Sequence, residues 1–104
     1  MTLTFHSLSL QSMKMMRAKS MRHAGESALH ELSWLLEELR LRSRLQERKP
    51  GVFYERGQAR LHFHEDPTGL FADLKSGADW LRFDVTSDDG RIKLLRQIDE
   101  PGRV

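Results

Sequence analysis

The stretch LHFHEDPTGLFADL, residues 61–74, decides the fold that this sequence predicts. Apolar and polar residues alternate on both sides of its centre, and a period of two is the pattern of a strand with one buried face. The centre itself, residues 65–69, reads EDPTG, and its proline and glycine favour a reversal of the chain. We therefore expect two antiparallel strands, 59–64 and 70–75, joined by a short turn.

Helical periodicity is found on both sides of this central region. From residue 23 to about residue 47, apolar residues recur at i, i+3, i+4 and i+7, which predicts one amphipathic helix. We expect the sequence Lys49-Pro50-Gly51 to end it, because proline lacks an amide hydrogen. A second helix is expected over residues 87–98, with Ser87 or Asp88 as its N-cap. The side chains expected to face inward are Ala28, Leu29, Leu32, Leu35, Leu36 and Leu39 in the first helix, and Ile92, Leu95 and either Ile98 or Leu94 in the second.

Two further segments with a period of two, residues 52–56 and 80–85, complete a predicted sheet of four strands. A sheet with one apolar face needs a cover, which the two helices can supply. We therefore predict an α+β fold in the order α-β-β-β-β-α. It is a two-layer sandwich in which a four-stranded antiparallel meander sheet is covered on one face by two helices. The residues expected on the buried face are Leu61, Phe63, Leu70, Ala72, Leu74, Leu81, Phe83 and Val85.

The basic character of the 104-residue chain belongs to its first twenty residues. They contain three Lys or Arg and no acidic residue, whereas residues 21–104 contain 14 basic and 15 acidic side chains, a net charge of −1. Because the predicted domain is close to neutral, the pI of about 9.3 does not by itself indicate nucleic-acid binding.

The chain has no cysteine, which excludes a disulfide framework, a thiolate zinc site and a cysteine nucleophile. This composition fits a reducing compartment, and we expect a cytoplasmic location. No apolar run approaches the roughly 20 residues that span a bilayer, so no membrane partner is expected.

We expect residues 1–22 to form a flexible tail or extension, and residues 23–104 to form a single domain. A later translation start is one alternative, because all five methionines lie in or next to this tail. An amphipathic membrane or targeting segment is another. The candidate starts are Met1, Met13, Met15, Met16 and Met21.

His62, His64 and Asp73 are the candidate residues for chemistry. The two histidines lie on one face of a predicted strand, and Asp73 lies on the next strand. Two imidazoles and a carboxylate can hold a catalytic zinc or non-haem iron ion. A histidine beside a carboxylate can also serve as a general base. Neither pattern is specific, and the alternative is that His62, Asp73 and Arg82 form cross-strand polar pairs on a solvated sheet face.

The same outer face carries aromatic side chains and an arginine, namely Tyr54, Phe71, Trp80 and Arg82. Interfaces are enriched in these residue types, and a solvated sheet face does not require them. We therefore predict a non-enzymatic interaction module that binds a protein partner or forms a homodimer through this face. A metal site or a His/Asp enzyme is the alternative, and no other cofactor is expected.

Nucleic-acid binding is a second alternative. The arginines of residues 40–44, with Arg48, Lys49, Arg56 and Arg60, could contact phosphates, and the aromatic residues of the outer face could stack on bases. The carboxylates on that face and the near-neutral charge of the domain argue against it. Under this alternative the domain is a weak nucleic-acid binder, and we expect a protein partner rather than a nucleic acid.

The run KPGVFYERGQARLHFHEDPTGLFADL, residues 49–74, resembles a group of small uncharacterised bacterial proteins. In these proteins a leucine-rich helix precedes Pro-Gly-x-Phe-Tyr, a His-Phe-His-Glu-Asp turn and Gly-Leu-Phe-Ala-Asp-Leu. The similarity extends from about residue 24 to residue 98. It implies a bacterial cytosolic domain and does not imply a particular activity.

Overall fold

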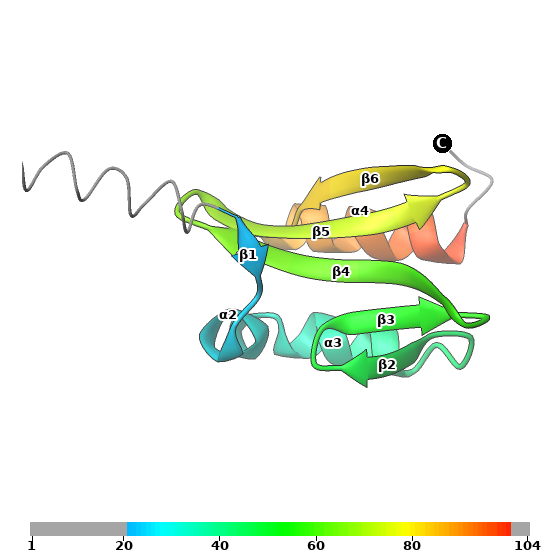
Figure 1. The fold of residues 1–104 in the computed structure, drawn as a ribbon. Coiled ribbons are helices and arrows are strands. Elements are labelled where there is room, and N and C mark those ends of the chain that lie inside the picture. The colour runs from blue at the N-terminus through cyan, green and yellow to red at the C-terminus, as the bar shows by residue number, and fades with distance from the viewer. Residues whose placement is uncertain (1–20, 101–104) are drawn as a thin grey trace, which may run out of the picture.

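The structure is a computed structural model, and it describes residues 21–100. Within this range the chain forms three helices and a six-stranded antiparallel sheet (Figure 1). The α+β class and the antiparallel sheet are therefore confirmed. The elements in chain order are β1 (Arg22–His23), α2 (Glu26–Glu31), α3 (Ser33–Arg40), β2 (Gln46–Lys49), β3 (Val52–Glu55), β4 (Gln58–Asp66), β5 (Gly69–Ser76), β6 (Asp79–Asp84) and α4 (Asp88–Asp99).

Five strands form a meander in the spatial order β2-β3-β4-β5-β6, and β1 pairs with β4. One edge of β4 pairs with β5 along residues 61–66. Its other edge pairs first with β3, as far as His62, and then with β1 at residues 64–65. The four predicted strands are thus present as β3 to β6. The prediction of a four-stranded sheet was wrong, because β1 and β2 also belong to it.

The prediction of one long helix over residues 23–47 was also wrong. Leu32 separates two shorter helices, α2 and α3, with φ −90° and ψ 13°, and the hydroxyl of Ser33 donates a hydrogen bond to the carbonyl of His30. The second of these helices ends at Arg40, because the chain then turns and enters β2. The order of the elements therefore differs from α-β-β-β-β-α.

Pro50 and Gly51 do not end a helix as we expected. They form the turn of the β2–β3 hairpin, in which Lys49 is the register partner of Val52. The fixed φ of proline suits the first turn position, and Gly51 adopts a φ of 76°, which favours glycine at the second. A Cβ at Gly51 would also lie 2.7 Å from the Leu29 side chain, so the hairpin packs directly on the helical layer.

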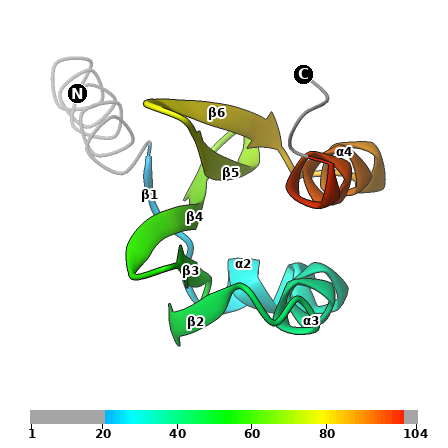
Figure 2. The same ribbon diagram turned by 90° about the vertical axis from the view of Figure 1, so that its right-hand side faces the viewer.

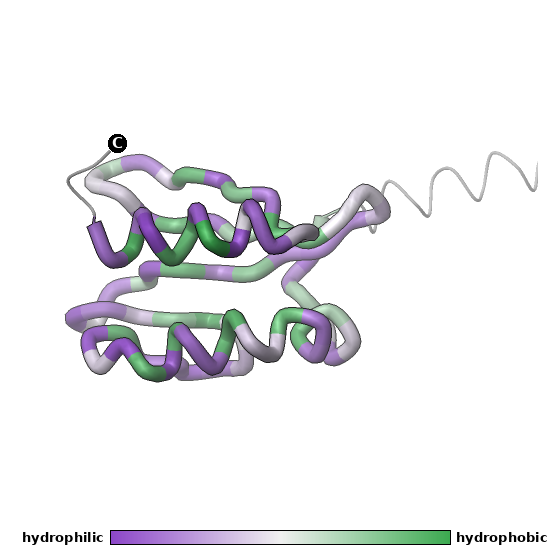
Figure 3. Tube along the Cα trace, turned by 180° about the vertical axis from the view of Figure 1, so that it is seen from behind, coloured by the Kyte–Doolittle hydropathy of each residue, from purple (hydrophilic) through white to green (hydrophobic). Residues whose placement is uncertain are grey.

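The helices pack on one face of the sheet. Figure 2 shows α3 and α4 on the same side of the curved sheet, with α3 near β2 and β3 and α4 near β5 and β6. Hydrophilic and hydrophobic residues alternate along both helices, as an amphipathic cover requires (Figure 3). The predicted cover of one face by helices is confirmed, and residues 21–100 form one domain with one core.

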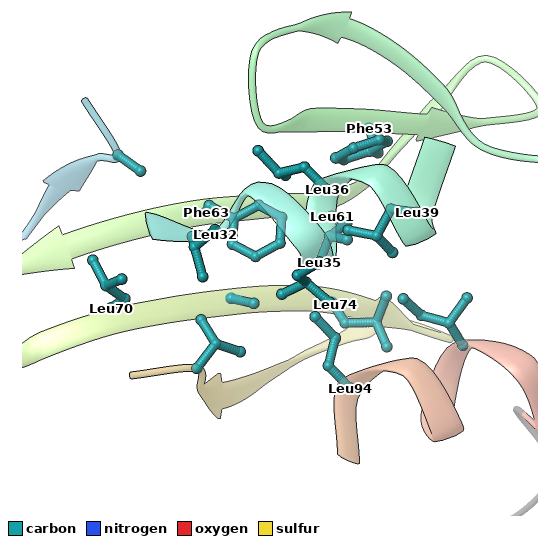
Figure 4. Packing of buried hydrophobic residues seen from close by; sticks show 14 of the residues in the cluster. Leu32, Leu35, Leu36, Leu39, Phe53, Leu61, Phe63, Leu70, Leu74 and Leu94 are labelled. Carbon is teal, nitrogen blue, oxygen red and sulfur yellow. The ribbon is translucent and has the colours of Figure 1, made fainter. Parts of the chain in front are cut away.

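The core lies between the sheet and the helices (Figure 4), where side chains from both layers are buried. The first helical stripe was predicted correctly, apart from the break at Leu32, and Leu29 is only partly buried. On α4 the prediction failed for Ile92, which is 43% exposed, whereas Arg91 is buried and donates hydrogen bonds to the carbonyls of Val85 and Thr86. The largest fully buried side chains are Phe53, Phe63, Leu32, Leu35, Leu39, Leu61, Leu74, Leu94, Ile98 and Val85.

Arg22, which we had placed in the N-terminal tail, belongs to β1. The remainder of the predicted tail, except Met21, and residues 101–104 lie outside the described residues, as do most of the candidate translation starts. No helix within residues 21–100 is both long enough and apolar enough to cross a bilayer.

Candidate functional site

The outer sheet face, opposite the helices, is built from cross-strand rows of side chains. In one row His62 on β4 faces Asp73 on β5, which faces Arg82 on β6. In a neighbouring row Lys75 faces Trp80. Directly paired residues in a sheet project from the same side, so β-strand register brings the predicted site residues together.

Asp73 is held between a guanidinium and an imidazole. Arg82 donates two hydrogen bonds of 2.8 Å, from Nε to Oδ1 and from Nη2 to Oδ2. His64 Nε2 lies 3.2 Å from Oδ2 of the same carboxylate. The hydrogen bonds from Arg82 lower the pKa of Asp73, and they outweigh the opposing effect of its burial. Both carboxylate oxygens are therefore occupied by partners from neighbouring strands.

His62 faces Asp73 in register, yet its Nε2 is buried and has no hydrogen-bond partner among residues 21–100. Its ring lies edge-on to Trp80, with centroids 5.3 Å apart, and stacks with His64 at 6.2 Å. Burial lowers the pKa of His62, and the nearby His64 lowers it further. Burial therefore favours the neutral form of the imidazole, which lies beside the Trp80 ring.

These side chains surround a hollow of about 370 Å³. Trp80 lies at the edge of this hollow and is 44% exposed, whereas the two histidines and the aspartate are half-buried. We call this the Trp80 hollow, and its lining is His62, His64, Asp73 and Trp80. An open depression with an aromatic wall and polar groups can accept an apolar side chain and fix its orientation.

His23 also belongs to this region, and the sequence prediction missed it. We had assigned it to the first helix, but it lies in β1 as the register partner of His64. Its Nε2 is 3.3 Å from the carbonyl oxygen of Pro50. A two-residue strand has no hydrophobic period, so no local signal could have placed this third histidine beside the other two.

Glu65 and Asp66 support the fold and take no part in the hollow. Glu65 accepts hydrogen bonds from the Gly25 amide at 2.7 Å and from Arg22 at 2.9 Å, which tie β1 and the start of α2 to β4. Asp66 accepts a hydrogen bond from the amide of Thr68 at 2.7 Å and thereby stabilises the β4–β5 turn. The carboxylates of the EDPTG turn are thus structural.

The other predicted interface residues lie at different places on the sheet. The Arg82 guanidinium lies 5.8 Å from the centre of the half-buried Phe71 ring, next to Asp73. Tyr54 lies on β3, where the Arg48 guanidinium is 4.3 Å from the centre of its ring. Neither Phe71 nor Tyr54 lines the Trp80 hollow.

The arginines of residues 40–44 are engaged in ion pairs. Arg40 pairs with Glu47 at 2.6 Å, and Arg42 pairs with Asp99 at 2.6 Å. Arg40 and Arg42, two members of the cluster proposed for phosphate contacts, therefore connect the end of α3 to β2 and to α4.

Within residues 21–100, no group of three or more His, Cys, Asp or Glu side chains is arranged to hold a metal ion. In comparisons with known proteins, no family model matches the chain, and no curated protein or solved structure matches it either. The resemblance to the bacterial group, the bacterial origin and the cytoplasmic location therefore stay predictions.

Proposed function

We propose that this domain is a non-enzymatic interaction module whose outer sheet face binds a protein partner, which can be a second copy of the chain. The observation that carries the proposal is the exposure of Trp80 at the edge of the Trp80 hollow. A tryptophan that is partly exposed beside a depression is a typical binding anchor, because burying it on association releases much ordered water.

The surroundings of Trp80 support this proposal. The ring of His62 lies edge-on to it, and burial favours the neutral form of that ring by lowering its pKa, while Arg82 and Asp73 form an ion pair beside it. A partner can cover such a surface without burying an unpaired charge, which would cost several kcal/mol. An apolar centre with a polar border is the usual arrangement of a protein interface.

Asp73 is poorly placed for general base catalysis, because Arg82 hydrogen-bonds both of its oxygens and lowers its pKa. A carboxylate stabilised in this way is a weak proton acceptor at neutral pH. The metal site or His/Asp enzyme at His62, His64 and Asp73 stays a prediction. Such a site requires that Arg82 moves away from Asp73. It also requires that His23 or another group moves closer to His62, His64 and Asp73.

A pair of tryptophan variants tests the proposal. Trp80→Glu places a charge on the outer sheet face, and Trp34→Glu is the matched control, because Trp34 is 38% exposed on α3. Light scattering after size exclusion measures the mass of each protein against the monomer mass of 12.1 kDa. Quantitative mass spectrometry then compares what each variant binds in a lysate of the source organism.

For a homodimer, we expect a doubled mass in the wild type and in Trp34→Glu, and a monomer in Trp80→Glu. For another protein partner, we expect a specific bound protein that Trp80→Glu alone loses. Equal behaviour of the two variants, with unchanged circular dichroism, would contradict a binding role for the outer sheet face.

A further inference from the structure

A second hollow lies at the end of the sheet that carries the β3–β4 and β5–β6 turns. Its volume is about 340 Å³, and we call it the basic hollow. Three cationic side chains and one carboxylate contribute to its lining. The lining consists of Glu55, Arg56, Gln58, Ala59, Arg60, Lys75 and Gly77.

Arg56 occupies an unusual place for an arginine. It lies with Gly57 in the two-residue turn between β3 and β4, and both residues have positive φ, 53° and 78°. Asn-Gly is the favoured pair in such a turn, because positive φ strains the Cβ of most residues, whereas asparagine tolerates this conformation. Arg56 is exposed and has no ion-pair or hydrogen-bond partner in the described part of the chain. The turn thus presents an unpaired cation at the basic hollow.

Arg60 supplies a second, more buried cation. Only 19% of its side chain is exposed, and its Nε is buried without a hydrogen-bond partner in the part of the chain that the structure describes. This nitrogen lies 3.2 Å from Oε1 of Glu55, and the same oxygen is 3.8 Å from Nε of Arg44. One carboxylate therefore faces two guanidinium groups, so the local positive charge is only partly compensated.

Lys75 connects the basic hollow to the Trp80 hollow. Its Nζ lies 5.3 Å from the centre of the Trp80 ring, and the two residues are register partners. The next outward-facing row along the strands contains His62 and Asp73, at a spacing of about 7 Å for two residues. An extended peptide can therefore reach both hollows with side chains a few residues apart.

We propose that the basic hollow binds one anionic side chain of the protein segment that places an apolar side chain in the Trp80 hollow. This inference rests on the proposed function and adds the chemistry of the partner. The anion is a carboxylate or a phosphoryl group, for which arginine offers paired N–H donors.

The charge pattern of the outer sheet face favours a protein segment over a nucleic acid. Positive charge collects at the turn end, around Arg56, Arg60 and Lys75. Beyond it, Asp73 and Asp84 carry negative charge on the same face. A segment with a single anionic group is attracted to the basic hollow, whereas a strand of consecutive phosphates also meets these carboxylates.

The test uses the full chain and two simple probes, inorganic phosphate and N-acetylglutamate, followed by amide NMR at constant ionic strength. The double variant Arg56→Asn with Arg60→Gln removes two cations and keeps the turn, because asparagine tolerates positive φ. Lys93→Gln with Arg96→Gln is the control, because it removes two exposed charges from α4.

We expect the amide chemical shifts near the β3–β4 and β5–β6 turns to change in a saturable way with at least one probe. The probe that binds more tightly indicates whether the natural anion is a phosphoryl group or a carboxylate. The hollow variant should bind about tenfold more weakly or worse, and the control variant should bind like the wild type. Shifts that are not saturable, or equal losses in both double variants, would overturn the inference.

A short oligothymidylate and a glutamate-rich peptide of equal charge separate the two kinds of partner. Tighter, strongly salt-dependent binding of the oligothymidylate would overturn the assignment to a protein segment. Trp80→Leu should leave phosphate binding intact. The two proposals are therefore tested separately. The probes can fail to bind the basic hollow although Trp80→Glu abolishes partner binding, and the probes can bind although Trp80→Glu leaves partner binding unchanged.

Discussion

The two faces of the sheet are made by the same strands, yet the side chains on them differ in burial and polarity. On the inner face Leu61, Phe63 and Leu74 are almost completely buried between the strands and the helices. On the outer sheet face, their neighbours His62 and Asp73 remain half-buried and polar. Alternation along a strand separates these roles, so the inner face determines stability and the outer face can vary for binding.

The largest effect that we expect is from Phe63→Ala, because Phe63 is fully buried in the core. The lost burial and the resulting cavity should lower the free energy of unfolding by about 3–5 kcal/mol. Phe71→Ala on the outer sheet face should cost less than half as much, since Phe71 is half-buried. Urea unfolding of both variants measures the difference, and equal losses would break the comparison between the faces.

Asp73→Asn should have the next largest effect, because it removes the carboxylate that Arg82 and His64 contact. Arg82 is half exposed, so solvent screening limits the loss to about 1–2 kcal/mol. The folded-state pKa of Asp73 lies below the unfolded value, so this stability is present above a pH of about 4. It is lost as the pH falls through the folded-state pKa.

The measurement for Asp73 is the unfolding free energy from pH 7 to pH 2. The Asp73→Asn variant should show a weaker dependence on pH at the acidic end than the wild type. Asp79→Asn in the β5–β6 turn serves as the control, since the Asp79 side chain is exposed. If the unfolding free energy of Asp73→Asn depends on pH in the same way as that of the wild type, the ionised Asp73 carboxylate does not stabilise the fold.

Arg56→Asn should raise the free energy of unfolding by about 1 kcal/mol or less, because asparagine relieves the strain at positive φ. Arg56→Ala, which removes the charge and keeps the strain, should not stabilise the protein. Thermal unfolding of the two variants separates the contributions of strain and charge. If Arg56→Asn is more stable than the wild type and also binds phosphate more weakly, then Arg56 serves binding at the expense of stability. This result would sharpen the contrast between residues that stabilise the fold and residues that bind.

The smallest expected effect is that of His62. Its folded-state pKa lies below the unfolded value, so the folded protein should lose stability as the pH falls below about 6.5. His62→Gln should remove this part of the pH dependence. NMR titration of the ring protons measures the pKa directly, and a value above 6.5 would contradict the buried neutral imidazole.

The hairpin of residues 61–74 was predicted well because its signals are local. Alternation placed Leu61 and Phe63 inward and His62 and His64 outward, and the Pro67 turn set the reversal. The candidate site followed from this alternation alone, since cross-strand register brings Asp73 next to the histidines. The cross-strand pairing of Asp73 with Arg82 also followed from the alternation, whereas the sequence did not indicate that Arg82 would donate to both carboxylate oxygens.

Residues 41–50 were predicted poorly because they carry no strand pattern. Gln46 to Lys49 are all polar, so they read as the end of a helix, yet they form an edge strand next to β3. Edge strands are often charged, since charge discourages pairing with other chains. The ion pair of Arg40 with Glu47 then fixes this strand to the end of α3.

The sequence by itself determined the α+β class, the strands β3 to β6, most of the core residues and the outward position of His62, His64 and Asp73. Periodicity and turn residues encode these features within a few positions of the chain. Only the tertiary structure decided that Arg22 and His23 pair with Glu65 and His64, and that two turns create a basic hollow. Such pairings join residues more than forty positions apart through backbone hydrogen bonds, which leave no pattern in the local sequence.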